Sequence, residues 1–261
     1  MPLIRRGALG FGLMAFADHL SSGVGVSIPL GPLNGLFGGA GTASPGLGGT
    51  ADDAPPPPLE SYIGRLGSLS GSRVLDVGAG TSGGSEGFLK HGAQEVVVTG
   101  LARLDQMDMV PTVRATMSEE ELSAPPALGA LGADGEATKA VACHPYDLAG
   151  ANLGTFDLVH CADQLRRATD PAKVTENLRE VAGGAVILCE RYDPDLDRFQ
   201  PSDVMEYVGA GRIPRWWRFG QSILCQLLQD AGFKRVTVLA SLRDTHAVDP
   251  RDRYWSLIRA E

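Results

Sequence analysis

The sequence predicts an α/β fold built on a mostly parallel sheet that helices cover on both faces. Short apolar runs alternate with segments of helical spacing, which is the order that βαβ units produce. The early runs are continuously apolar, as strands are when both faces of a sheet are buried. Hydrophobic residues make up 43% of the 261 residues, which allows a sizeable core.

Seven segments are predicted strands because they are short, apolar and bounded by glycine, proline or polar residues: Arg73–Val77, Glu95–Leu101, Ala140–Cys143, Phe156–Cys161, Ala185–Cys189, Lys234–Leu239 and Tyr254–Arg259. Three segments have helical spacing: Ser85–His91, Pro171–Val181 and Gln221–Ala231. Gly183-Gly184 and Gly232 are predicted to end the second and third helix. Ser118 and Glu121 form a capping-box pattern, which predicts another short helix.

Residues 1–58 are predicted to be a leader outside the folded domain, which then spans residues 59–261. The leader holds 13 of the 34 glycines and 8 of the 17 prolines, and it closes with Pro55–Pro58. Leu59–Leu69 is expected to form a short helix or turn before the first strand. Residues 104–139 are expected to be an irregular insert, because a segment of this length between strands is usually a lid or a binding loop.

The start of the leader leaves two interpretations open. Arg5-Arg6 precede an apolar run over Gly7–Ala17, which imitates a short signal peptide, and no acidic residue precedes Asp18. The alternative is a flexible segment rich in glycine and proline. The run is too short for a stable membrane-spanning helix. We therefore expect a cytoplasmic protein, with targeting to an organelle through residues 1–58 as the alternative.

Charge and cysteine content narrow the class of function. The net charge of −8 and the pI of about 5.2 argue against binding driven by nucleic-acid phosphates, which requires clustered Lys and Arg. The four cysteines form no C-x-x-C pair, so neither a metal site nor a redox motif is predicted. Their apolar surroundings are typical of a reducing compartment.

The stretch VLDVGAGTSGG, residues 74–84, is the most informative motif. Its Gly78-x-Gly80-x-x-Gly83 spacing fits a dinucleotide fingerprint, in which a pyrophosphate sits on the following helix. Asp76 would repel that pyrophosphate by about 4 kcal/mol at ~4 Å and an intermediate dielectric. The same carboxylate would favour a phosphate-free cofactor with a positive charge, such as S-adenosylmethionine.

With its later motifs, the sequence resembles the class I S-adenosylmethionine-dependent methyltransferases over about residues 70–261. VLDVGAG is similar to the family's first motif, Tyr146-Asp147-Leu148 to its acidic segment after strand three, and FDLVHC to its fourth strand. The ending AGFKRVTVL…RYWSLIRA is similar to the family's terminal antiparallel hairpin. The resemblance implies a Rossmann-like three-layer sandwich with a seven-stranded sheet.

The resemblance also implies a set of residues that bind S-adenosyl-L-methionine: Asp76, Gly78, Ala79, Gly80, Leu101, Asp147, Leu148 and His160. Asp76 would support the ammonium end of the cofactor, and Asp147 would meet the adenine amino group. The family's ribose-binding acid falls on or near Ala102 here. Asp105 is the nearest acid that could replace it.

Methyl transfer is an in-line displacement at an activated sulfonium, so positioning carries most of the effect. A general base is needed only if the acceptor holds a proton, and the candidates are His160, Glu190 and Tyr192. We predict transfer to a small-molecule acceptor, with the oligomeric state left open. A finer resemblance to tRNA wobble-uridine methyl- and carboxymethyltransferases, in FDLVHCADQLRRATDP and WWRFGQSILCQLLQDAGF, makes RNA the alternative acceptor.

That branch usually has His where Arg166 or Arg167 stands, and this difference favours the small molecule. A non-catalytic, methyltransferase-like binding protein is the hypothesis from another class.

Overall fold

The computed structural model describes residues 55–78, 84–126, 137–199, 204–209, 215–245, 247, 251 and 253–261. All of these residues belong to one compact unit. The leader predicted over residues 1–58 falls almost wholly outside them, so its boundary and its role stay predictions. No helix in the described ranges is long and apolar enough to cross a membrane.

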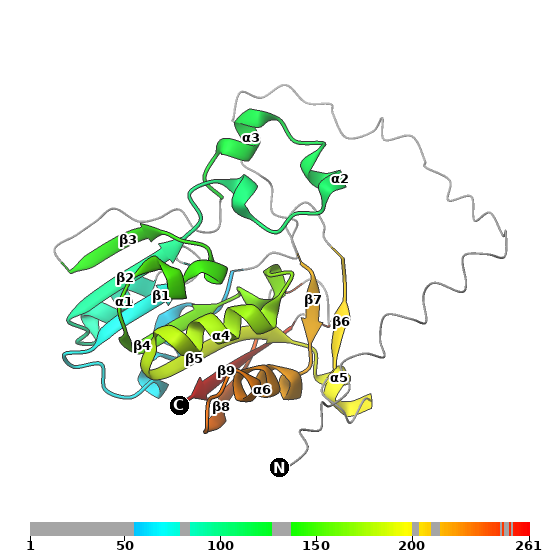
Figure 1. Ribbon diagram of the computed structural model, residues 1–261. Helices are drawn as coiled ribbons and strands as arrows, with labels where there is room; N and C mark the ends of the chain where they lie inside the picture. The colour runs from blue at the N-terminus through cyan, green and yellow to red at the C-terminus, as the bar shows by residue number, and fades with distance from the viewer. Residues whose placement is uncertain are drawn as a thin grey trace, which may run out of the picture. The chain divides into compact units, whose positions relative to one another are not determined.

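Seven strands form one sheet in the order β3-β2-β1-β4-β5-β9-β8 (Figure 1). They span Arg73–Val77 (β1), Glu95–Gly100 (β2), Thr138–Ala142 (β3), Phe156–Ala162 (β4), Ala182–Tyr192 (β5), Val236–Arg243 (β8) and Tyr254–Ala260 (β9). Strands β3, β2, β1, β4 and β5 are parallel to one another, whereas β9 is antiparallel to both β5 and β8. This arrangement confirms the predicted sheet and its C-terminal antiparallel hairpin.

Two hydrophobic cores on opposite faces of the sheet make the molecule a three-layer sandwich. The first lies between the sheet and the helices α4 (Pro171–Val181) and α6 (Gln221–Asp230), which lie on the same face in Figure 1. The second lies under α1 (Gly84–Lys90) and two 3₁₀ turns, η1 (Leu59–Ser61) and η2 (Ile63–Arg65). The residues predicted as a short helix or turn thus form the cover of the second face.

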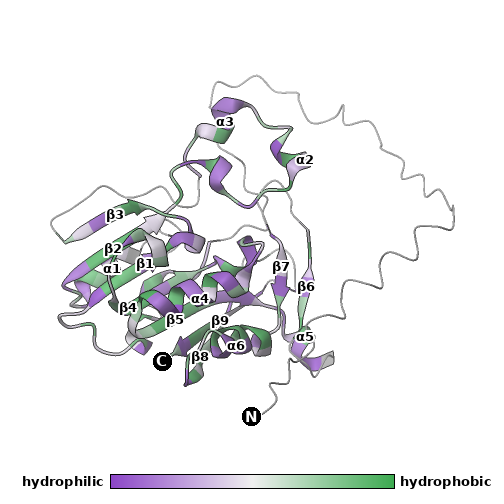
Figure 2. Ribbon diagram, in the orientation of Figure 1, coloured by the Kyte–Doolittle hydropathy of each residue, from purple (hydrophilic) through white to green (hydrophobic). Residues whose placement is uncertain are grey.

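Helices α4 and α6 form where the spacing of apolar residues predicts them. Figure 2 shows α4 alternating between hydrophobic and hydrophilic residues, whereas β5 is hydrophobic over most of its length. Asp170 caps α4 by accepting a hydrogen bond from the Lys173 amide at 3.0 Å, and Pro171 occupies the first turn. Gly232 follows α6 with φ of +97°, a conformation that ends a helix at little cost for glycine.

The prediction that Gly183-Gly184 end the second helix is wrong. Helix α4 ends at Val181, and both glycines lie inside β5. The register between β4 and β5 shifts between Phe156 and Leu158. At this irregularity a Cβ on Gly184 would lie 2.2 Å from the Asp157 carbonyl oxygen, so the close approach of two backbones requires glycine there.

Three elements after β5 carry no clear signal in the sequence. A short helix, α5 (Pro194–Phe199), precedes the two-stranded antiparallel sheet of β6 (Met205–Tyr207) and β7 (Trp217–Phe219). We call β6 and β7, with the residues that adjoin them, the hairpin 204–219; its residues 210–214 are not described. The hairpin stands apart from the main sheet and leads directly into α6 (Figure 1).

The segment after β2 is partly helical. It contains a 3₁₀ turn, η3 (Leu104–Gln106), and two short helices, α2 (Pro111–Arg114) and α3 (Glu119–Ser123). The capping box predicted from Ser118 and Glu121 is present: the Ser118 hydroxyl accepts from the Glu121 amide at 3.2 Å, and Glu121 accepts from the Ser118 amide at 2.8 Å. Residues 127–136 are not described.

Candidate functional site

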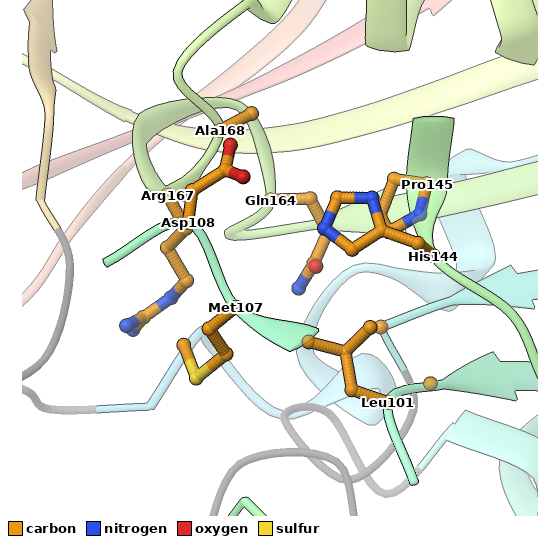
Figure 3. Close-up of a pocket in the computed structure, with 10 residues that line it drawn as sticks. Leu101, Met107, Asp108, His144, Pro145, Gln164, Arg167 and Ala168 are labelled. Carbon is orange, nitrogen blue, oxygen red and sulfur yellow. The ribbon is translucent and has the colours of Figure 1, made fainter. Parts of the chain in front are cut away.

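A pocket lies at the carboxyl edge of the parallel strands (Figure 3). Its lining residues lie at the end of a strand or in the segment that follows one: Gly78, Gly100, Leu101, Met107, Asp108, His144, Pro145, Gln164, Arg167 and Ala168. Strand β1 lies between β2 and β4, where the strand order reverses. Open α/β sheets bind ligands outside the carboxyl ends of their strands at such a reversal.

Gly78 brings the backbone to the pocket wall at the end of β1. Its φ is +81°, a conformation that glycine adopts freely and other residues avoid. Its amide donates to the Thr99 carbonyl at 3.0 Å, which holds the end of β1 against β2. Ala79 and Gly80, predicted to bind the cofactor, lie outside the described residues, and their roles stay predictions.

Asp76 and His160 are brought together directly beneath this turn. They are neighbours in the register of β1 and β4, and His160 Nδ1 lies 2.8 Å from Asp76 Oδ1. His160 Nε2 lies 2.8 Å from the Tyr62 hydroxyl. Burial raises the pKa of Tyr62 far above its ordinary value, with Cys189 and Asp76 adding to the shift. None of the three lines the pocket of Figure 3.

The segment after β3 divides between two surfaces. His144 and Pro145 line the pocket beside Gly78, whereas Asp147 lines a neighbouring surface pocket with Lys173 and Asn177. Leu148 is fully buried in the core. The structure therefore brings His144, rather than Asp147, to the pocket wall. Burial lowers the pKa of His144, which favours its neutral form.

Leu101 lines the pocket at the end of β2, but Asp105 does not. Asp105 accepts from the Arg103 guanidinium at 3.1 and 2.7 Å. The hydrogen bonds from Arg103 lower the pKa of Asp105, and Arg114 acts in the same direction. The Asp105 carboxylate is therefore bound by arginine away from the pocket, and Asp108 is the acid of this segment that lines the pocket.

A buried charge cluster supports the wall after β4. Asp163 is fully buried at φ of +57° and bonds both Arg166 and Arg167; its Oδ2 lies 2.5 Å from Arg167 Nη2. Burial raises the pKa of Asp163, but the two arginines outweigh it and lower the value to about 2. Arg167 also lines the pocket, so the cluster fixes a positive charge in its wall (Figure 3).

Glu190 and Tyr192, two of the three base candidates, lie away from the pocket lining. Glu190 is fully buried at the end of β5 and accepts from the Leu165 amide at 2.8 Å. Burial, followed by the charge of Asp163, raises the pKa of Glu190 to about 7. The Tyr192 hydroxyl donates to the hydroxyl of Ser241 on β8 at 3.0 Å.

Asp108 ties the segment after β2 over the pocket. Its Oδ2 accepts from the Tyr146 hydroxyl at 2.5 Å, the Thr169 amide at 2.6 Å and the Thr169 hydroxyl at 2.8 Å. Burial and the hydrogen bond to Asp108 raise the pKa of Tyr146 to about 12, so Tyr146 donates. The cavity that these residues line measures ≈ 50 Å³, far below the roughly 300–1,000 Å³ of small-molecule sites. The described residues alone therefore do not enclose room for a cofactor, and residues 79–83 beside Gly78 are not described.

An aromatic group adjoins the same wall. The Trp216 indole donates to the Asp108 carbonyl at 2.8 Å, and the Trp217 indole donates to the Ala168 carbonyl at 3.0 Å. The ring of Tyr207 lies 6.2 Å and 5.7 Å from the rings of Trp216 and Trp217, between centroids. Tyr207 is 60% exposed. The tryptophans thus fix the hairpin 204–219 to two pocket-lining residues.

Sequence patterns missed most of the pocket wall: Met107, Asp108, His144, Pro145, Gln164, Arg167 and Ala168. Their common signal is position, because each lies within eight residues of a predicted strand end. That signal identifies the edge of the sheet but not which side chains turn into the pocket. Among the described residues, no group of three His, Cys, Asp or Glu side chains is placed to hold a metal ion.

Comparisons with known proteins find likeness among solved structures. No family model matches the sequence, and no curated protein matches it. The N-terminal domain of EvdMO1 with SAH bound is 16% identical over 78% of this chain and 80% of that chain, with a TM-score of 0.51.

Two further solved structures match with lower TM-scores. A putative S-adenosylmethionine-dependent methyltransferase from Listeria monocytogenes is 14% identical over 77% of this chain and 96% of that chain, with a TM-score of 0.48. The 1,6-didemethyltoxoflavin-N1-methyltransferase of Burkholderia thailandensis is 17% identical over 77% and 73%, with a TM-score of 0.46. The likeness to the EvdMO1 domain, together with the strand order, shows that the chain has a Rossmann-like fold.

Proposed function

We propose that the protein is an S-adenosylmethionine-dependent methyltransferase that acts on a small molecule. One observation carries the proposal: in a methyltransferase fold, the pocket lies at the carboxyl ends of β1 and β2, beside Gly78 and Leu101. These are residues that the sequence motifs predict to bind the cofactor. Fold alone does not establish activity, so the proposal depends on the chemistry of this edge.

The charges at this edge suit the amino-acid end of the cofactor, which carries an ammonium and a carboxylate. Asp76 supplies a buried carboxylate whose Oδ2 has no hydrogen-bond partner among the described residues. A buried polar oxygen without a partner is costly, and a cationic group nearby would relieve that cost. Arg167, held by Asp163, supplies a positive charge in the pocket wall for the cofactor's carboxylate. When bound, the cofactor supplies a methyl group already activated by a sulfonium.

The pocket supports catalysis by positioning rather than by a general base. His144 Nδ1 accepts from the Tyr146 amide at 3.1 Å. Neutral His144 therefore carries its proton on Nε2. From Nε2 it can donate a hydrogen bond to the methyl-accepting molecule, but Nε2 cannot take up a proton from that molecule. Asp108 Oδ2 is engaged by Tyr146 and Thr169. We propose that these side chains orient an acceptor, which is where most of the rate effect of methyl transfer arises.

Two observations support a small-molecule acceptor over RNA. The aromatic group of Tyr207, Trp216 and Trp217 adjoins the pocket wall and offers rings for stacking on a planar molecule. Arg218, part of the arginine-rich stretch beside the tryptophans, is buried and bonded to Glu206 at 2.5 Å. It is therefore not presented to phosphates, and the net charge of −8 opposes RNA binding in the same direction.

Isothermal titration of the full chain with S-adenosylmethionine and S-adenosylhomocysteine tests the proposal. We expect both to bind, and Leu101→Arg to weaken binding at least about tenfold because it fills and charges the pocket wall. Val238→Arg is the matched control, because Val238 is 37% exposed on β8, at the far edge of the sheet. This substitution should leave cofactor binding unchanged. Circular dichroism confirms that both variants fold.

If titration with S-adenosylmethionine and S-adenosylhomocysteine releases no heat at high protein concentration, the proposed methyltransferase activity is refuted. That result would favour an inert methyltransferase-like protein. Competition by NAD would refute the charge argument based on Asp76. Once binding is established, methyl transfer is measured with radiolabelled cofactor on planar aromatic phenols and, separately, on transfer RNA at two salt concentrations. Salt-sensitive labelling of RNA alone would reject the small-molecule acceptor.

A further inference from the structure

Three polar side chains form a continuous chain through an otherwise apolar layer. Tyr62, His160 and Asp76 are 1%, 0% and 2% exposed, and two hydrogen bonds of 2.8 Å join them. They come from the turn between η1 and η2, from β4 and from β1. Around them the core under α1 consists of aliphatic and aromatic side chains, including Phe88, whose ring lies edge-on to His160 at 5.4 Å.

The direction of each hydrogen bond in this chain follows from chemistry. The Asp76 carboxylate can only accept, so His160 donates its Nδ1 proton to Asp76 Oδ1. In this tautomer His160 Nε2 carries no proton and accepts from the Tyr62 hydroxyl. Tyr62 thus stabilises this tautomer of His160, and His160 in turn fixes one oxygen of Asp76.

Packing alone does not explain why Tyr62, His160 and Asp76 form this hydrogen-bonded network. Well-packed apolar side chains of the same volume would usually be at least as stable as a buried polar network. The network also leaves Asp76 Oδ2 without a partner among the described residues, and a buried oxygen without a partner destabilises the fold. The position of the network is informative, because Asp76 lies two residues before Gly78, which lines the pocket.

We infer that Tyr62 and His160 are positioning residues that orient the Asp76 carboxylate for the ammonium group of the cofactor's amino-acid end. The inference rests on the proposed function and extends it to the segment before the sheet. Tyr62 lines no part of the pocket, yet through His160 it determines which oxygen of Asp76 is committed and which is left for the ligand. The cover formed by residues 59–66 is therefore part of the cofactor site.

The test compares two ligands that share the adenosine thioether. S-adenosylhomocysteine carries the ammonium, whereas methylthioadenosine lacks the whole amino-acid end. We expect Tyr62→Phe to weaken S-adenosylhomocysteine binding about fivefold, the equivalent of one neutral hydrogen bond. We expect no change with methylthioadenosine. Asp76→Asn should act in the same direction more strongly, because it removes the charge itself.

Ser256→Ala is the matched control. Ser256 is fully buried on β9 and accepts from the Gln221 side chain at 2.9 Å, so its loss also removes one buried hydrogen bond. Strand β9 lies three places from β1 in the sheet. The variant should lower the melting temperature as Tyr62→Phe does, with both nucleosides bound as in the wild type. Nitrogen-15 NMR should show Nδ1 protonated on His160 and a shifted Nε2 in Tyr62→Phe.

Each outcome has a definite meaning. Equal weakening of both nucleosides by Tyr62→Phe would overturn the inference, because it would show a general structural role. Unchanged binding of S-adenosylhomocysteine would overturn it as well. If the wild-type chain binds neither nucleoside, the proposed function itself fails and the inference with it. This last result is distinguished from the others because it precedes any substitution.

Discussion

Glu190 makes the stability of the protein depend on pH in a direction opposite to that of a carboxylate paired with arginine, such as Asp163. The side chain is fully buried, and burial together with the charge of Asp163 raises its pKa from 4.5 to about 7. In the unfolded chain the group returns to its ordinary value. Folding therefore binds a proton between these two values, and the perturbation that isolates this effect is Glu190→Gln, which has the same shape and no charge.

The magnitude follows from the two pKa values. A raised folded pKa contributes stability that is fully present below about pH 4.5 and is lost as the pH rises through about 7. The difference between the two values corresponds to about 3 kcal/mol. Asp163 does not obscure this loss. The pKa of Asp163 is lowered from 3.8 to about 2, so its contribution is present above about pH 4 and lost only on acidification.

The assay is urea unfolding of both proteins across this range, followed by tryptophan fluorescence. We expect the unfolding free energy of the wild type, minus that of Glu190→Gln, to fall by about 3 kcal/mol between about pH 4.5 and pH 7.5. Taking the difference cancels the titration of groups that the substitution leaves alone. A difference that stays constant with pH, or that rises, would refute the assignment of the raised pKa to Glu190.

Two further predictions concern close packing and the pocket wall. Gly184→Ala should lower the unfolding free energy by about 1–3 kcal/mol in urea, because its Cβ would lie 2.2 Å from the Asp157 carbonyl oxygen; Gly150→Ala, with nothing within 4 Å of the new Cβ, should not. Equal effects would contradict the backbone contact. Asp108→Ala should speed cofactor association on the order of tenfold in stopped-flow mixing, because the carboxylate ties the pocket wall to Tyr146. An unchanged rate would show that the wall opens without breaking this bond.

The fold could be predicted from the sequence because its strongest signals are local. Short, mostly apolar runs such as Arg73–Val77 and Phe156–Ala162 are typical of strands in the centre of a parallel sheet. The start of helix α4 is marked locally by Asp170 as the N-cap and Pro171 in the first turn. These signals depend on a few neighbouring residues, and no distant contact overrides them.

Where the prediction failed, long-range contacts decide the structure. Gly183-Gly184 resemble a helix stop in every local respect, yet they lie inside β5 because the register shift against β4 demands a residue without a side chain. The strands of the hairpin 204–219 have only three residues each, too few to show an alternating pattern. The tryptophans that anchor it bond backbone carbonyls 48 to 108 residues away, which no local pattern encodes.

In the candidate site, too, local signals predict some residues and tertiary contacts decide the others. Gly78 and Leu101 reach the pocket because they end strands, and strand ends are predictable. Asp147, predicted to meet the cofactor, lies in the 3₁₀ turn Pro145–Asp147, and His144 before that turn lines the pocket instead. The side chain that faces the pocket then depends on the phase of that turn, which the sequence does not specify. Burial similarly separates Glu190 from the pocket, although it too ends a strand.

The polar groups of the interior are distributed unevenly, and this distribution links stability to function. Buried charged side chains gather at the carboxyl ends of β1, β4 and β5, in Asp76, Asp163, Glu190 and Arg191. At the opposite ends of these strands Val74, Phe156 and Ala182 are buried in the cores, whereas the charged Arg73 and Asp157 are not buried. A sheet selected for stability alone would gain from apolar residues at both ends. The charges therefore lie where this fold binds ligands. We expect a zwitterionic ligand that pairs with these charges to stabilise the protein and so offset their cost.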